Sequence, residues 1–230
     1  MKLLYYILIC CIIVLGGCSK EETTAMPVDT TVALTGVDLA IANGEPMASI
    51  LANFPLSEFY GKSYQGGLIF YVDSLNATGL VAIQDVNNDD PQMNWWYTQG
   101  AHLQGFSCSV GAGQNNTNII VNTQGVGDYA AYYCDTLSFA GHSDWFMPSI
   151  DELSLMYSQI GQQTNANFQL AGYMSTNRDS VLVNTSPTAY QFTEIGIHFD
   201  HGGPMSFTVY VVSSNFFQSP GYVRPVRQFN

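Results

Sequence analysis

The chain has 230 residues, of which 47% are hydrophobic and only 10% are charged, and its formal net charge is −12 at pH 7. This length and composition fit one globular domain with a short additional segment. Because so acidic a surface repels nucleic acid and anionic lipid headgroups, we expect neither as a partner.

The N-terminus carries the apolar run "LLYYILICCIIVL", whose thirteen residues are fewer than the roughly 20 that a membrane-spanning helix needs. Leu15-Gly16-Gly17-Cys18 follows, and it resembles the lipobox of bacterial lipoproteins. The resemblance implies a signal peptide over 1–17 and lipidation at Cys18. Lys20-Glu21-Glu22 resembles the export signal of Bacteroidota surface lipoproteins, so we expect an outer-membrane lipoprotein exposed at the cell surface. An ordinary cleaved signal is the alternative.

The mature chain keeps two cysteines besides Cys18, namely Cys108 and Cys134. An even pair in an exported protein predicts a disulfide. It would close a loop of roughly 25 residues and stabilise the fold by about 3–4 kcal/mol. Two buried free thiols are the alternative.

Residues 18–45 are rich in Thr, Ala and Val, and we predict that they form a tether. Apolar residues at helical spacing then predict a helix between Pro46 and Pro55. The runs 66–73 and 79–85 predict two strands joined as a hairpin, and their nearly continuous apolar character favours central positions in a sheet.

A long polar region over 86–126 follows, in which the predicted disulfide would hold the chain. The segment "GDYAAYYCDTL" predicts a helix with Asp128 as its N-cap. In "SDWFMPSIDELSLMY", Ser149 and Glu152 have the spacing of a capping box at the start of the next helix. The apolar residues of that helix recur at spacings of three and four and predict a buried face.

The C-terminal third contains the strand-like pieces "GYMST", "TAYQF", "FTVYVVSS" and "YVRPVRQF". Pro225 in the last piece predicts an edge position or a bulge. We therefore expect one α+β domain over 46–230, with short antiparallel or mixed strands, two to three helices and a long loop region.

The order of motifs resembles the Lcl C-terminal domain family (DUF1566); the motifs are "YGKSYQGGLIFYVD", "GLVAIQD", "GAGQNNTNIIV", "AAYYCDTL", "GHSDWFMPSIDELSLMY", "GYMSTN" and "YVRPVRQF". The resemblance implies a C-type-lectin-like fold related to the sulfatase-modifying factors, and an adhesive, glycan-binding activity. Two departures matter. Tyr173-Met174-Ser175-Thr176 stands where the family has Tyr-Trp-Ser-Ser. The acidic surface also does not suit sulfated polysaccharides, which are the ligands of the collagen-like adhesin after which the family is named. Trimers occur among the relatives, which leaves oligomerisation open.

Trp95 and Trp96 are the candidate platform for a sugar ring, with Asn94 beside them as a hydrogen-bonding group. The alternative is that at least one of the two indoles is core, since adjacent side chains in an extended chain point in opposite directions. Asn115 and Asn116 in "GAGQNNTN" offer amides on a Gly-rich loop, and the favoured interpretation there is a cap of the following helix. Asp144 is a further candidate for reaching a ligand.

Asp85, Asp89 and Asp90 supply enough oxygens for calcium, but the EF-hand spacing is absent and a solvated acidic turn is favoured. No nucleophile elbow or phosphate loop is present in the sequence, so we expect no catalysis. The predicted function is non-catalytic binding of a glycan. The alternative is a structural or assembly subunit that binds a cell-surface protein.

Overall fold

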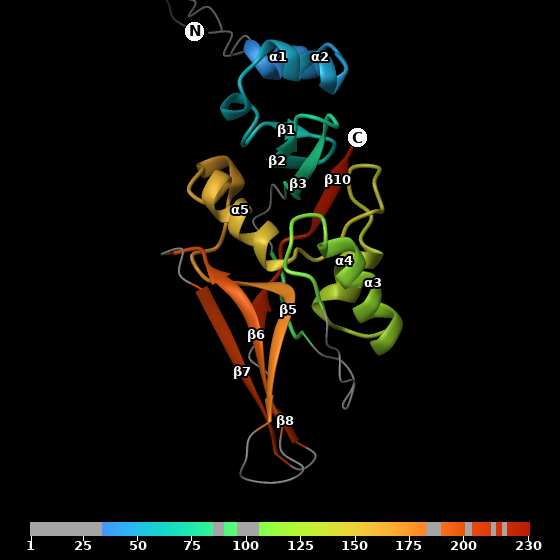
Figure 1. The fold of residues 1–230 in the computed structure, drawn as a ribbon, viewed down its shortest axis with the longest axis vertical. Coiled ribbons are helices and arrows are strands. Elements are labelled where there is room, and N and C mark those ends of the chain that lie inside the picture. Colours follow the sequence, from blue (N-terminus) through green and yellow to red (C-terminus); the bar gives the residue numbers. More distant parts are fainter. Residues whose placement is uncertain are drawn as a thin grey trace, which may run out of the picture. The chain divides into compact units, whose positions relative to one another are not determined.

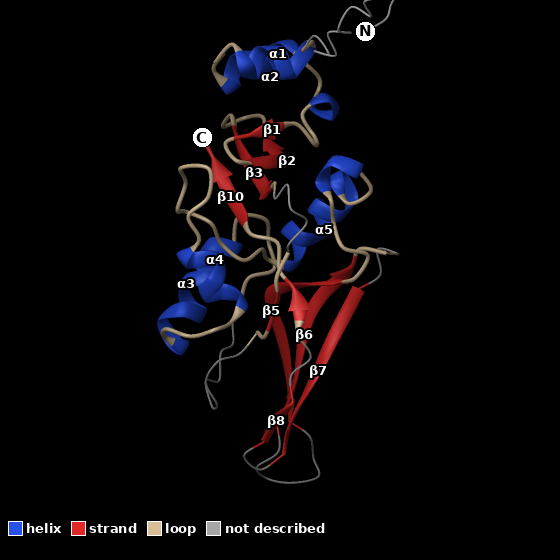
Figure 2. Ribbon diagram, turned by 180° about the vertical axis from the view of Figure 1, so that it is seen from behind, coloured by secondary structure: helices blue, strands red, loops and turns tan. Residues whose placement is uncertain are grey.

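The computed structural model describes residues 34–84, 90–95, 106–182, 190–200, 204–212, 215–217 and 220–230. These residues belong to one compact unit that begins at Leu34 (Figure 1). They form five α-helices and two β-sheets, which confirms the α+β class (Figure 2). The sequence predicted only two to three of these helices. None of the helices in these ranges is long and apolar enough to cross a membrane.

The first sheet has four strands in the order β1-β2-β3-β10. Their bounds are Ser63–Tyr64 (β1), Gly67–Asp73 (β2), Thr78–Ile83 (β3) and Val226–Phe229 (β10). The predicted hairpin is confirmed, because β2 and β3 pair antiparallel and both occupy inner positions. Pro225 immediately precedes β10, which lies at the edge of the sheet as its proline predicted.

The two faces of this sheet bury different side chains. Leu68, Leu80 and Val226 share one cluster with the apolar face of α5 (Ile150–Ile160). Ile69, Val81 and Phe229 point to the opposite face and pack against α1 (Gly36–Ala42), α2 (Met47–Asn53) and the indole of Trp145. A sheet buried on both sides explains why its strands are nearly continuously apolar.

The folded unit begins earlier than the predicted domain boundary at residue 46. Val37 and Ala40 of α1 are buried. Asp38, on the same helix, forms an ion pair with Lys62, which lies just before β1. Residues 36–45 therefore belong to the domain, and the expectation of a tether running to residue 45 is wrong for this part. A seven-residue helix, about two turns long and with two buried positions, is too short to stand out by periodicity.

The region expected to be a loop contains a helix, α3 (Gly113–Gln124). The segment "GAGQNNTN" supplies its first turns instead of a loop, and no side chain caps it. Helix α4 (Ala130–Thr136) confirms the helix predicted there, but its N-cap is Tyr129 rather than Asp128. Its inward side chains meet α3, Trp95, Met147 and Met174 in a third buried cluster.

The capping box at the start of α5 is confirmed. The Ser149 hydroxyl accepts the backbone N–H of Glu152, while the Glu152 carboxylate accepts the backbone N–H of Ser149 at 2.7 Å. Leu153, Met156 and Ile160 form the expected buried face of the helix. Trp145, just upstream, is buried as expected.

The second sheet has six strands in the order β4-β9-β5-β6-β7-β8. Their bounds are Gln92–Met93 (β4), Gly172–Leu182 (β5), Tyr190–His198 (β6), Pro204–Val212 (β7), Asn215–Phe217 (β8) and Gly221–Tyr222 (β9). The pairs β5–β6 and β6–β7 are antiparallel, and Figure 1 shows these three strands running side by side. Strand β9 joins β5 in parallel at Tyr173 and Tyr222. Two short 3-10 turns, Leu56–Glu58 (η1) and Thr164–Ala166 (η2), complete the described elements.

The predicted disulfide is absent, because Cys108 and Cys134 are free thiols. Cys134 is fully buried on the inner face of α4, among Ile120 and Met147. Cys108 is exposed on the segment before α3, and its sulfur accepts an N–H of the Asn177 side chain at 3.3 Å. The two cysteines therefore have separate surroundings, and polar contacts hold the 106–113 segment in place of a covalent bond.

Candidate functional site

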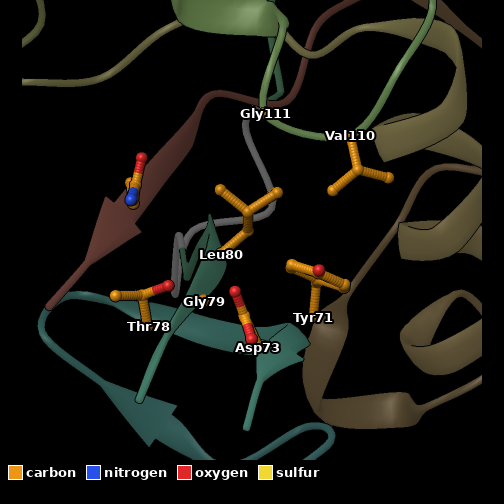
Figure 3. A pocket seen from close by; sticks show the side chains of 8 residues that line it. Tyr71, Asp73, Thr78, Gly79, Leu80, Val110 and Gly111 are labelled. Carbon is orange, nitrogen blue, oxygen red and sulfur yellow. The ribbon is translucent and has the colours of Figure 1, made fainter. Parts of the chain in front are cut away.

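A small pocket lies on one face of the first sheet. Its volume is about 180 Å³. Strand residues form one side and a short stretch of loop forms the other (Figure 3). The lining residues are Tyr71, Asp73, Thr78, Gly79, Leu80, Val110, Gly111 and Gln228.

The strand register explains how these side chains meet. Tyr71 is paired with Leu80, Asp73 with Thr78, and Gln228 with Leu80, so their side chains share one face of the sheet. The β2–β3 register shifts between Ile69 and Tyr71, which inserts Phe70 as an extra residue. Such a bulge re-aims the following side chain, and here Tyr71 packs on the same cluster as Phe70.

Gly79, which lines the pocket, lets the backbone of β3 approach β2 and the Phe229 ring closely. A Cβ atom at this position would come within 2.2 Å of the Tyr71 carbonyl oxygen and 2.4 Å of the Phe229 ring. Any side chain there would push the strands apart.

The Asp73 carboxylate is held in place by the hairpin turn. Its Oδ1 accepts the backbone N–H groups of Leu75 at 3.0 Å and Asn76 at 3.3 Å, and its Oδ2 accepts the Asn76 side-chain amide at 2.6 Å. The hydrogen bond from the Asn76 side chain is the largest cause of the shift and lowers the pKa of Asp73; burial opposes it, and the two backbone hydrogen bonds lower the pKa further. The pocket thus contains an ionised, oriented carboxylate.

The opposing wall of the pocket, Val110 and Gly111, is fixed by a buried glutamate. Glu152 Oε1 accepts the backbone N–H of Gly111 at 2.8 Å and that of Gly113 at 3.4 Å. Gly113 has to be glycine, because a Cβ there would lie 2.3 Å from Glu152 Oε2. Desolvation raises the pKa of Glu152, although the backbone amides of Ser149, Gly111 and Gly113 oppose the shift.

Further hydrogen bonds extend this attachment along the segment. The Ser149 hydroxyl donates to the Ser109 carbonyl at 3.0 Å, and the Asp151 N–H donates to the Cys108 carbonyl at 3.2 Å. The Asn177 amide donates to the Ser107 carbonyl at 3.2 Å. We call these contacts, together with those of Glu152, the α5 latch, because they tie residues 107–113 to the start of α5 and to β5.

A second buried polar group joins the two sheets. Arg224, between β9 and β10, pairs with Asp90 at 2.5 Å, and both side chains are almost fully buried. The same guanidinium donates to the carbonyls of Ile83 at 2.9 Å and Ala166 at 3.1 Å. The Tyr173 hydroxyl donates to Asp90, and burial raises the pKa of Tyr173, with the Asp90 charge adding to the shift.

The structure corrects the prediction that Trp95 forms a sugar platform. Its side chain is 1% exposed and its indole N–H donates to the Ser175 carbonyl at 2.9 Å. The Phe106 ring meets it edge-on. Trp95 therefore belongs to the core, which was the alternative interpretation for at least one of the two tryptophans. Asn94 is exposed beside it, and Trp96 lies outside the described residues.

The other predicted ligand contacts are spread over the molecule. Asn116 is buried, and its side chain donates to the Ser107 carbonyl at 2.8 Å and to the Thr176 hydroxyl at 2.9 Å. It therefore has a structural role and is not placed to contact a ligand. Asn115 is exposed on α3. Asp144 accepts a hydrogen bond from Arg227, which places it on the β10 side of the first sheet. No shared site forms from these residues.

The acidic segment considered for calcium is only partly described. Asp85 and Asp89 lie outside the described residues. Asp90 is buried and paired with Arg224, so the structure corrects its assignment to a solvated or calcium-binding turn. Within the described ranges, no group of three or more His, Cys, Asp or Glu residues is placed to hold a metal ion.

Sequence reasoning missed Tyr71, Asp73, Thr78 and Gln228, because they lie in strands that it treated as scaffold. One signal was present: Tyr71 and Asp73 are two residues apart, so they share a face at the polar end of an otherwise apolar strand. What the sequence could not show is that Gln228, from the far end of the chain, and Gly111 lie opposite them.

Compared with known proteins, the chain matches no family model, no curated protein and no solved structure.

Proposed function

We propose that this chain is a non-catalytic, lipid-anchored binding module of the bacterial outer membrane, and that it binds a glycan at the cell surface. The lipid on Cys18, the C-type-lectin-like fold and membership in the Lcl C-terminal domain family belong to the same proposal. The single observation that carries the ligand class is the pocket on the first sheet, with an aromatic ring and three polar side chains on one face.

The chemistry of the pocket suits a sugar. A pyranose presents an apolar face, which an aromatic ring covers, and hydroxyl groups around its edge that need donors and acceptors. Tyr71 supplies the ring, while Asp73, Thr78 and Gln228 supply the polar groups. The pocket of about 180 Å³ is smaller than the roughly 300–1,000 Å³ of sites for drug-sized ligands, so one sugar residue fits it better than an enclosed oligosaccharide.

The charges argue against sulfated glycans. The described basic side chains are all engaged: Lys62 with Asp38, Arg224 with Asp90, Arg227 with Asp144, and Arg178 over the Trp95 ring. No basic residue lines the pocket within the described part of the chain. A sulfate would therefore meet an acidic surface with no cation available to pair with it.

A glycan array tests the proposal with the domain from about residue 23 onward and its Tyr71→Ala variant. Loss of the stacking ring should lower affinity for the bound glycan by about two- to tenfold, since ring contacts of this kind contribute about 0.5–1.5 kcal/mol. Tyr64→Ala is the matched control, because Tyr64 is a half-buried tyrosine that packs on Phe229 away from the pocket. If Tyr71→Ala and Tyr64→Ala bound the glycan equally well, the assignment of the site to this pocket would be contradicted. A blank array with folded protein would contradict the glycan ligand and favour a protein partner.

A further inference from the structure

The negative charge of Asp73 in the pocket restricts which glycans would bind there. This inference rests on the proposed function. We infer that the pocket selects a saccharide with a free, protonated amine, such as a non-acetylated hexosamine. The site assigns the Asp73 carboxylate to the ammonium group and the Tyr71 ring to the apolar face of the same sugar. No cation among the described lining residues competes for that carboxylate.

The hydrogen bonds to Asp73 leave room for such a ligand. All three come from the hairpin turn, two to Oδ1 and one to Oδ2. Because an ionised carboxylate has about four acceptor positions, the Oδ2 atom keeps one for an N–H donor. The turn also fixes the orientation of the side chain, so little conformational entropy is lost when an ammonium binds.

The neighbouring ring strengthens the preference for a cation. Tyr71 lies two residues before Asp73 on the same strand and the same face. An aromatic face attracts an ammonium group as well as an apolar surface. Carboxylate and ring together are therefore complementary to an amino sugar. An N-acetyl group has no charge and needs additional space in a pocket of only about 180 Å³.

The test compares matched oligosaccharides of glucosamine and of N-acetylglucosamine by calorimetry at mildly acidic pH, where the amine is protonated. The lowered pKa of Asp73 keeps its carboxylate ionised there. We expect the free-amine form to bind about five- to tenfold more tightly, as for a charge-assisted contact of about 1 kcal/mol or more. Asp73→Asn should abolish this preference, and asparagine retains the Oδ1 that caps the turn.

A matched control is needed because an acidic protein attracts any polycation. Asp128→Asn makes the same change at an exposed position before α4, away from the lining residues of the pocket. Only Asp73→Asn should remove the preference. Equal loss in both variants, or equally tight binding of the acetylated form, would overturn the amine inference while leaving the glycan proposal intact. Failure of every saccharide to bind would overturn both.

Discussion

Cys134 and Cys108 differ in ways that their spacing in the sequence does not reveal. Cys134 is fully buried in α4, and desolvation raises the pKa of its thiol, so it is unreactive in the folded protein. Cys108 is exposed at the start of the segment that the α5 latch holds. The disulfide was predicted to hold this segment in place, but hydrogen bonds hold it instead.

Thiol titration of the domain from residue 23 checks this difference. One cysteine, Cys108, should react with an aromatic disulfide reagent in the folded state, and both should react after denaturation. Reducing agent should leave the unfolding midpoint unchanged, whereas a disulfide would contribute about 3–4 kcal/mol and lower the midpoint when reduced. A folded protein without a reactive thiol, with a midpoint that falls on reduction, would reinstate the disulfide.

The same limit of sequence reasoning applies to individual aromatic residues. Trp95 and Tyr71 are both large and amphipathic, and nothing local in the sequence separates a core ring from a pocket ring. The difference arises from long-range contacts: Ser175 accepts the Trp95 N–H, whereas a bulge in β2 aims Tyr71 at the pocket. Ser149 and Glu152, in contrast, could be predicted because both partners of a capping box lie within four residues.

The N-terminus of α5 does more than start a helix. Its capping residues also bind the segment before α3, so one carboxylate serves Ser149, Gly111 and Gly113 together. The local half of this arrangement follows from the sequence motif. The other half depends on two glycines about forty residues upstream, Gly111 and Gly113, whose role shows only in three dimensions.

Glu152→Gln tests the α5 latch. The variant keeps the shape of the side chain but turns one acceptor oxygen into a donor that faces another N–H. We expect it to lower the free energy of unfolding by about 1.5–3 kcal/mol, the range for hydrogen bonds to a charged group. Asp151→Asn is the control on the same helical turn, since this exposed side chain should cost at most about 1 kcal/mol through the helix dipole. Denaturant titration of both variants measures the difference, and equal values would contradict the latch.

The pH dependence gives a second readout of Glu152. Its folded pKa is raised above the ordinary value of 4.5, so the folded state holds this proton more tightly than the unfolded state. The contribution of this group to stability is therefore fully present below pH 4.5 and falls as the pH rises through the folded pKa. The gap between wild type and Glu152→Gln should be larger just below pH 4.5 than at neutral pH. A gap that grows toward neutral pH would contradict the raised pKa.

At the scale of the whole molecule, the two sheets depend on contacts between distant parts of the chain. Sequence patterns predicted the β2–β3 hairpin and the edge position of β10, since these follow from turns, apolar runs and Pro225. They did not predict that Arg224 would reach Asp90, because neither residue belongs to a local motif. A charged residue is expected at the surface, so only the folded structure shows that this pair is buried.

The buried pair should therefore matter more than an exposed pair of the same kind. Asp90→Asn leaves the Arg224 guanidinium uncompensated in the interior and should cost about 3–5 kcal/mol. Asp38→Asn breaks the pair with Lys62, whose side chains are 33% and 34% exposed, and should cost at most about 1 kcal/mol. Combining Asp90→Asn with Arg224→Met should recover much of the loss, because the second change removes the unpaired charge. Chemical denaturation of wild type, Asp90→Asn, Arg224→Met and the double variant measures this coupling, and Asp38→Asn serves as the exposed-pair reference. Additive losses would mean that Arg224 acts through its carbonyl contacts with Ile83 and Ala166 rather than through Asp90.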